Sequence, residues 1–314
     1  MKSVRPLLLA LAPLIIGLTV YFFYWRGEAN GLAADIAAVT GRSVDVDGFP
    51  YRLNAPLDGV DIARGETASV RFQAGRAAIG SQPFGAGLYV GRFEAARIDA
   101  RAGGIPMAAL TITAPSVQAS LRVDRFIERL SMRAEKAEIV TPLFAAPIAA
   151  EALEVHIRET PNPAADAIVG QAEARLAGDF ALASDVDLRL ALPIKITASR
   201  PLVALAAWRD AGAIEIEGGE IEAVDGAALA GFDAKLQPGP DGALSLSGEL
   251  ATDCPATMAA LVAGDVRPAT EYRQRRPARF TIAGTLAAPQ LIPIPGPTGG
   301  RARNREPPCP DLRR

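Results

Sequence analysis

Histidine is almost absent from this sequence of 314 residues, which has one imidazole, His156. Nucleophilic triads and most zinc sites need an imidazole with partners in defined roles. The sequence contains neither G-x-S-x-G nor H-E-x-x-H, and it has no phosphate-binding G-x-x-x-x-G-K-[ST] loop. His156 stands between Glu154 and Arg158 on the polar side of an alternating stretch, as surface histidines do. We therefore expect no catalytic residue, no metal ligand and no cofactor, and we do not expect an enzyme.

The chain also lacks an excess of charge of either sign, since it has 33 lysines and arginines and 35 acidic residues, and its net charge is −2. No basic excess remains to neutralise phosphates, which argues against nucleic acid as a partner. Four arginines gather locally, and either a solvated strand edge or an anionic lipid headgroup would accommodate them. They are Arg273, Arg275, Arg276 and Arg279.

One long uncharged run is present, from Leu7 to Trp25. As a helix it would cover roughly 28 Å, close to the ~30 Å hydrocarbon core of a bilayer. A cleaved signal peptide is the alternative, but the run ends in bulky aromatic residues instead of small ones, and aromatic rings suit the bilayer interface. Lys2 and Arg5 precede the run and favour a cytoplasmic N-terminus. We predict a single-pass anchor in the inner membrane, with the body in the periplasm.

Two cysteines, Cys254 and Cys309, fit no metal or redox spacing. In an oxidising compartment such a pair forms a disulfide, which we predict here. The bond would fix a proline-rich tail that we expect to be extended, over residues 287–314.

The body between these segments alternates polar and apolar residues with a period of two, which is typical of strands with one wet face. The clearest examples are residues 117–123, 153–158 and 186–196, and Pro193 marks a bulge or an edge in the last of these. Further strands are expected near 57–63, 69–79, 87–99, 107–114 and 131–140. Few helices intervene, so the pattern predicts a mainly β fold, a long curved antiparallel meander.

Three short helices interrupt this pattern. Apolar spacing and a closing glycine predict helices over 28–40, from Pro201 to Gly212, and from Pro255 to Val262. Two hairpins are also expected. One joins 232–236 to 243–250, and the other turns at Gly218-Gly219.

The hairpin at Gly218-Gly219 would place acidic residues opposite one another, pairing Glu217 with Glu220 and Glu215 with Glu222. Like charges in direct opposition destabilise a sheet. Arginines from a neighbouring strand, a bound divalent cation or solvation at an exposed edge would each offset the repulsion.

A weak repeat of an apolar, small, glycine, polar and apolar residue occurs three times, at 176–180, 246–250 and 282–286. Each glycine is in phase with its apolar neighbours, where a missing side chain permits a bulge or a close approach. Long repetitive sheets with an apolar concave face are common among lipid-handling envelope proteins.

The stretch Gly48-Phe49-Pro50-Tyr51-Arg52 is a strand entry with two aromatic residues. At this motif, and in its order of anchor, short helix and β-rich body, the chain resembles a proteobacterial envelope family, domain of unknown function family 2125. A looser similarity to AsmA-like envelope proteins rests on the anchor, the meander and the glycine repeat. Neither resemblance implies catalytic residues.

These observations predict three parts: a membrane anchor over residues 1–26, a periplasmic β-rich domain over 27–286, and the extended tail over 287–314. The leading interpretation is a non-enzymatic envelope domain that binds lipid or a partner envelope protein. A purely structural or assembly scaffold is the alternative, and a carboxylate-dependent hydrolase is a third.

Overall fold

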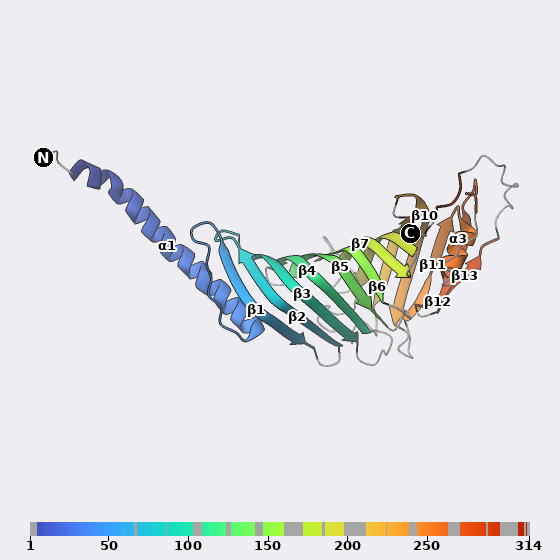
Figure 1. The fold of residues 1–314 in the computed structure, drawn as a ribbon, viewed down its shortest axis with the longest axis horizontal. Helices are drawn as coiled ribbons and strands as arrows, with labels where there is room; N and C mark the ends of the chain where they lie inside the picture. Colours follow the sequence, from blue (N-terminus) through green and yellow to red (C-terminus); the bar gives the residue numbers. More distant parts are fainter. Residues whose placement is uncertain are drawn as a thin grey trace, which may run out of the picture.

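The computed structural model shows a single long curved sheet with α1 projecting from its β1 end (Figure 1). It describes residues 5–295 apart from 66–67, 86, 103–108, 124–126, 142–146, 160–171, 184–185, 198–211, 224, 239–243, 263–270 and 287, and also residues 307–310 and 312. The side chains of residues 5–12 lie outside this description.

Thirteen strands form the sheet, and their spatial order is their order in the sequence. Each strand pairs antiparallel with the next, so the predicted mainly β meander is confirmed. The strands are β1 (Leu53–Arg64), β2 (Ala68–Ser81), β3 (Leu88–Ala102), β4 (Ala109–Val123), β5 (Ile127–Val140), β6 (Ile148–Glu159), β7 (Ala172–Ala183), β8 (Val186–Thr197), β9 (Ala213–Ala223), β10 (Ala228–Pro238), β11 (Leu244–Thr252), β12 (Ala278–Thr285) and β13 (Ala288–Pro293).

The N-terminal helix α1 (Arg5–Thr40) is continuous, so the predicted anchor and the predicted helix over 28–40 are parts of one helix. It ends at Gly41, whose φ of 70° and bond from its N–H to the carbonyl of Ala37 are those of a helix C-terminus. A buried stripe at helical spacing packs its second half against β1 and β2. The stripe is Trp25, Ala29, Leu32 and Ile36.

No helix within the described part of the chain is long and apolar enough to cross a membrane. The uncharged run has described side chains from Pro13 to Trp25, which cover about 20 Å of helix. Its first six residues, Leu7 to Ala12, lie outside the described side chains.

Each of the first six strands has an irregular step near its middle. The buried apolar positions advance there by three residues instead of two, as from Leu57 to Val60 in β1 and from Ala134 to Ala137 in β5. Residues with positive φ lie inside some of these steps, including Ala95 (51°) and Lys136 (52°). The registers from β1 to β6 continue through these steps without a shift, so the six strands bend together across this part of the sheet.

At the other end of the sheet, α3 (Pro255–Val262) confirms the predicted helix. Its Met258 is 1% exposed and packs with Leu188, Leu250 and Ile282 of three strands. The predicted disulfide is present between Cys254 and Cys309, with 5.9 Å between the two Cα atoms. It attaches the tail beside α3, where Leu312 is 3% exposed.

Two expectations are wrong. The strands expected near 107–114 and over 117–123 are one strand, β4, because the break in alternation between Ala114 and Val117 is a bend within it; residues 107–108 lie outside the described residues. The predicted hairpin at Gly218-Gly219 is likewise absent, since β9 runs through both glycines. Gly218 has a φ of 67°, which bends the strand without reversing it.

The predicted hairpin of β10 with β11 is confirmed by the antiparallel register of the two strands. Pro193 lies where the β8–β9 ladder shifts, which confirms a bulge there. Residues 288–293 of the predicted tail form β13. The predicted helix from Pro201 to Gly212 falls on 201–211, outside the described residues.

Candidate lipid-binding surface

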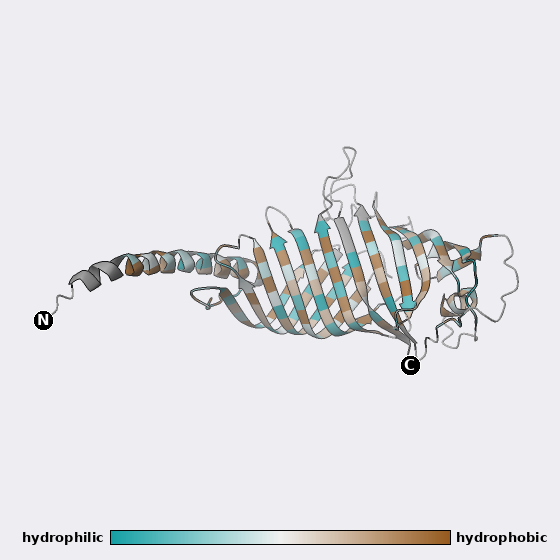
Figure 2. Cartoon of the chain, turned by 90° about the horizontal axis from the view of Figure 1, so that it is seen from above, coloured by the Kyte–Doolittle hydropathy of each residue, from teal (hydrophilic) through white to brown (hydrophobic). Residues whose placement is uncertain are grey.

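The two faces of the sheet differ in chemistry, because apolar and polar residues alternate along the strands (Figure 2). We call the side that carries the buried apolar residues the apolar face and the opposite side the ionic face. Directly paired residues on neighbouring strands project to the same side of a sheet. The strand registers therefore allow the apolar face to be followed from one end of the sheet to the other.

A row of directly paired residues crosses all thirteen strands on the apolar face. At roughly 4.8 Å between strands, twelve spacings give about 58 Å along the curved sheet. The row is Leu53, Ser81, Tyr89, Leu121, Leu130, Ile157, Ala174, Ile194, Ile216, Ala234, Gly248, Ile282 and Leu291.

The two members of this row that carry a hydroxyl have partners. Ser81 donates to the carbonyl oxygen of Leu88 at 2.9 Å, and Tyr89 donates to a carboxylate oxygen of Asp35 on α1 at 3.2 Å. Burial and the neighbouring Asp35 carboxylate raise the pKa of Tyr89, which keeps its hydroxyl a donor. The row therefore presents an apolar surface where its side chains are described; Gly248 carries none, and that of Ala174 lies outside the described residues.

A second apolar row crosses β1 to β6 on the other side of the bend. It consists of Ile62, Phe72, Ile98, Ile112, Ile139 and Ile148. Between the two rows lie the steps that bend the strands, and small residues fill them. Seven alanines there are each 7% exposed or less, namely Ala74, Ala77, Ala96, Ala114, Ala134, Ala137 and Ala150.

The ends of the apolar face are covered by helices. At β1 the α1 stripe packs on Leu53, Leu57 and Val60, and at the far end Met258 of α3 lies in one buried cluster with residues of β8 to β12. The apolar cluster in the middle of the sheet contains no helix residue among those described. Larger side chains beside the bend stay half-buried there, including Phe93, Met132 and Val155.

The ionic face has charged pairs between neighbouring strands. They include Arg71–Asp61, Arg76–Glu94, Arg133–Glu154, Arg189–Asp179, Lys235–Glu215 and Arg279–Glu249. Pairs this exposed contribute little free energy of folding individually. They keep this side of the sheet in water and make it a poor surface for an apolar ligand.

One carboxylate of the ionic face is held more firmly than the others. Hydrogen bonds from the Arg97 guanidinium and then from the Thr111 hydroxyl lower the pKa of Asp99 to about 2. The Asp99 side chain is 20% exposed. This carboxylate is therefore a structural acceptor that stays ionised, unsuited to proton transfer near neutral pH.

Three of the four glutamates of β9 face basic residues of neighbouring strands, and none of the four faces another glutamate. Glu215 pairs with Lys235 at 3.1 Å, Glu217 binds Lys195, and Glu222 is opposite Arg189. Glu220 is opposite Ala191 and Gly231. The repulsion expected from a hairpin does not arise, because the strand continues through Gly218. Within the described part of the chain, no group of three His, Cys, Asp or Glu side chains could hold a metal ion.

His156 lies on the ionic face, as predicted, with its side chain 48% exposed and 3.7 Å from Glu154. The arginine cluster is distributed over separate partners. Arg273 donates to Asp253 and to the carbonyl oxygen of Ala228, while Arg279 binds Glu249. These contacts are those of a partly solvated surface.

The glycines of the repeat lie where the chain backbone approaches closely, as predicted for them. A Cβ on Gly248 would lie 2.1 Å from the carbonyl oxygen of Asp233, and one on Gly178 would lie 2.8 Å from that of Ala152. Gly219 plays a related role, since a Cβ there would lie 2.8 Å from the ring of Phe232. A side chain at these positions would push apart the strands of the apolar face.

The motif at residues 48–52 forms the turn that enters β1. Gly48 has a φ of 103°, and a Cβ on it would lie 2.8 Å from the carbonyl oxygen of Arg52, so glycine is required. The N–H of Arg52 donates to the carbonyl of Gly48 at 3.2 Å. Phe49 contacts Trp25 of α1, with 5.4 Å between ring centroids. The motif thus joins the helix to the sheet.

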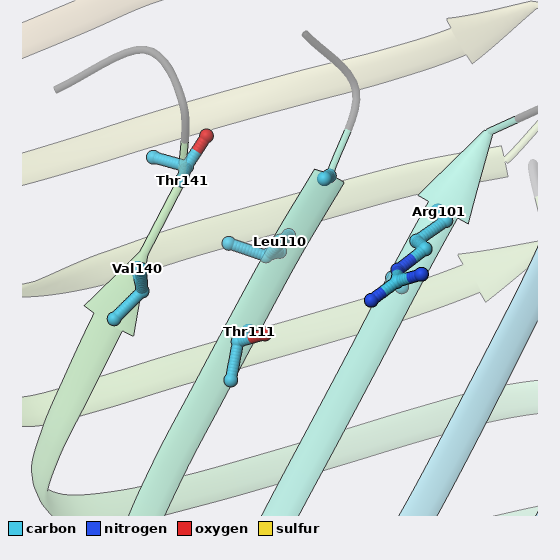
Figure 3. Close-up of a pocket in the computed structure, with 7 residues that line it drawn as sticks. Arg101, Leu110, Thr111, Val140 and Thr141 are labelled. Carbon is cyan, nitrogen blue, oxygen red and sulfur yellow. The ribbon is translucent and has the colours of Figure 1, made fainter. Parts of the chain in front are cut away.

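A separate open depression of about 330 Å³ lies at one end of β3, β4 and β5 (Figure 3). Among the described residues that line it, Arg101 is the charged one, beside Leu110, Thr111, Val140 and Thr141. We assign no function to this depression.

Sequence reasoning missed two parts of this surface. Phe84 joins the aromatic residues around α1 although it lies 35 residues after Phe49, and no local pattern connects them. The alanines of the bend were missed because a three-residue step resembles a strand break. Counting pairs such as Ala134 and Ala137 in successive strands would have revealed it.

Comparisons with known proteins give one match. No curated protein and no solved structure matches the chain, and nothing among the comparisons supports the AsmA-like similarity. A family model described as "Uncharacterized protein conserved in bacteria (DUF2125)" matches residues 24–288, which run from the second half of α1 to the first residue of β13. The resemblance seen at the Gly48–Arg52 motif is thereby confirmed, and the chain belongs to the DUF2125 family.

Proposed function

We propose that this protein is a membrane-anchored lipid-binding protein whose apolar face holds acyl chains. The row of thirteen paired residues carries the proposal, because it extends one apolar surface over the whole length of the sheet. The first half of α1 is the anchor in the inner membrane, and the sheet lies in the periplasm.

The anchor is supported by the exposure of α1 where it leaves the sheet. Leu14, Ile15, Ile16, Leu18 and Val20 are 54–64% exposed, and no charge occurs between Leu7 and Trp25. A helix that exposes apolar residues on all sides suits a membrane better than water. The basic residues Lys2 and Arg5 favour a cytoplasmic start.

The periplasmic placement is supported by the disulfide. Disulfides persist in oxidising compartments such as the periplasm and are rare in the cytosol. Cys254 is fully buried, so its bond with Cys309 belongs to the core at the far end of the sheet.

Lipid is the occupant that the chemistry of this surface favours. Both edges of each inner strand are already paired within the sheet, so an occupant of the apolar face gains apolar contacts instead of backbone hydrogen bonds. An acyl chain needs no hydrogen bonds and gains about 0.8 kcal/mol for each CH₂ group removed from water. The face also begins next to the helix that provides the anchor, which places it close to a source of lipid.

Co-purification tests this proposal. The full chain, extracted in mild detergent, is expected to carry phospholipid that native mass spectrometry detects. Met132→Lys places a charge on the uncovered middle of the apolar face, and Ser131→Lys places the same charge on the ionic face of the same strand. We expect lipid to be lost from the Met132 variant and kept by the Ser131 variant.

Circular dichroism and an intact disulfide establish that both variants fold. If the folded wild-type chain carries no lipid, or if the two variants lose it equally, the lipid-binding proposal is wrong. A scaffold without a lipid ligand would then be the better interpretation.

A further inference from the structure

Aromatic side chains from the sheet gather around α1 at the point where the helix leaves the sheet. Phe49 and Tyr51 belong to the turn before β1, and Phe84 belongs to the connection between β2 and β3. They are 43%, 86% and 74% exposed. Two connections that are distant in the sequence therefore present aromatic rings at the same level of the helix.

Rings of α1 complete this group. Tyr24 stacks on Phe84 with 5.1 Å between centroids, and Tyr21 lies 5.9 Å from Phe49 and 6.0 Å from Phe84. We call Tyr21, Tyr24, Phe49 and Phe84, together with the exposed Tyr51 two residues after Phe49, the aromatic collar. It unites the helix with both connections.

Hydrogen bonds fix the collar in place. The Tyr24 hydroxyl donates to the carbonyl oxygen of Pro83 at 2.6 Å, and the Tyr21 hydroxyl donates to that of Pro50. The Trp25 indole N–H donates to the carbonyl oxygen of Arg52 at 3.1 Å. The collar is thus a built part of the fold, although several of its rings are exposed.

The collar separates an apolar region from a charged one. On its N-terminal side, α1 exposes the large apolar residues between Leu14 and Val20. On its other side the helix carries Arg26 and Glu28, and Arg52 lies in the turn directly before β1. Single exposed apolar residues are normal on a protein surface, but rings gathered at such a boundary are characteristic of membrane–water interfaces.

We propose that the aromatic collar lies in the headgroup region of the bilayer that α1 enters, so that the β1–β3 end of the sheet rests on the membrane surface. This inference depends on the proposed function for the anchor, and it adds a second membrane contact made by the folded domain itself. The apolar face would then begin at the membrane surface, where a lipid can pass onto it.

Site-directed spin labelling of the full chain in phospholipid nanodiscs tests the collar. The labels replace the side chains of Tyr51 or Phe84, through Tyr51→Cys and Phe84→Cys, with the native disulfide kept oxidised. Tyr272→Cys is the matched control, because Tyr272 is a 52% exposed aromatic residue in the segment that pairs with the tail at the far end of the sheet.

We expect labels at positions 51 and 84 to collide several-fold less often with a water-soluble nickel chelate than the label at 272, and more often with oxygen. If the chain enters nanodiscs but all three labels are equally accessible to the chelate, the collar inference is wrong and the anchor stands. If the chain fails to associate with bilayers at all, both the proposed anchor and the proposed membrane contact of the collar are wrong.

Discussion

The end of the apolar face beneath α1 and its middle, which no described helix covers, bury their apolar side chains in different ways. At the β1 end, α1 supplies a second layer, and large residues such as Leu53 and Leu57 are 3% and 7% exposed beneath Trp25 and Leu32. In the middle, the alanines of the bend are buried to this degree together with Val117, Ile148, Leu153 and Phe180, while Met132 and Val155 stay half-buried. Both regions therefore contain a buried core, and the middle keeps half-buried apolar side chains that the proposed lipid would cover.

Removal of the disulfide, at the end of the sheet beside α3, should lower the free energy of unfolding more than any other substitution predicted below. The bond spans 55 residues and attaches the tail beside α3, so the variant with both Cys254→Ser and Cys309→Ser should lose about 4 kcal/mol of unfolding free energy. Urea unfolding measures the loss. Reductant should destabilise the wild type and leave the variant unchanged; a loss below about 1 kcal/mol would contradict the role of the bond.

Truncations in the two regions should differ in cost. Leu32→Ala opens a cavity under α1 where Leu32 is 4% exposed, and we expect a loss of about 3 kcal/mol. Met132→Ala removes a half-buried side chain from the uncovered middle, with an expected loss of about 1 kcal/mol. Unfolding in lipid-free detergent measures both. Equal losses would show that the middle is packed as tightly as the end.

Substitutions in the bend should stabilise the chain. Ala95 and Lys136 have φ values of 51° and 52°, which cost L-residues energy that glycine avoids. Ala95→Gly and Lys136→Gly should each raise the unfolding free energy by about 0.5–1 kcal/mol. Ala119→Gly, at a strand position outside the bend, is the control and should lower it by a similar amount. A loss at all three positions would argue against a strained bend.

The smallest expected effect is a pH dependence on the ionic face. The pKa of Asp99 is lowered to about 2, so its contribution to stability is present above its usual pKa near 3.8 and is lost as the pH falls towards 2. Asp99→Asn should therefore melt below the wild type at pH 6, and the difference should shrink between pH 4 and pH 2. A difference that stays constant over this range would contradict the assignment.

The sequence predicted the fold well where one residue pattern decides the structure. Alternation identified most strands, and the spacing of Leu32 and Ile36 identified the packed half of α1. It failed where a strand bends without ending. The three-residue step between Ala114 and Val117 looks like a break between two strands, and the glycine pair at Gly218 looks like a turn. Ala95 and Lys136 adopt positive φ without being glycine, so no residue type reveals them.

The sequence predicts that the sheet has an apolar side, but it does not predict how far that side extends. Alternating strands and glycine repeats indicate an apolar side, yet the row of paired residues from Leu53 to Leu291 depends on twelve strand registers. Each register is set by tertiary packing, since a slip of one residue would exchange the two faces. The collar depends in the same way on Phe84 meeting Tyr24, a contact between segments 60 residues apart.

Photo-crosslinking with a diazirine-bearing phospholipid, incorporated into nanodiscs with the full chain, tests the central claim most directly. Mass spectrometry of the peptides from β5 and β6 would locate each adduct. Adducts are predicted at Met132 and Val155 on the uncovered apolar face, and none at the adjacent Ser131 and His156 on the ionic face. Equal labelling of the two faces, or labelling confined to α1, would contradict lipid binding by the sheet.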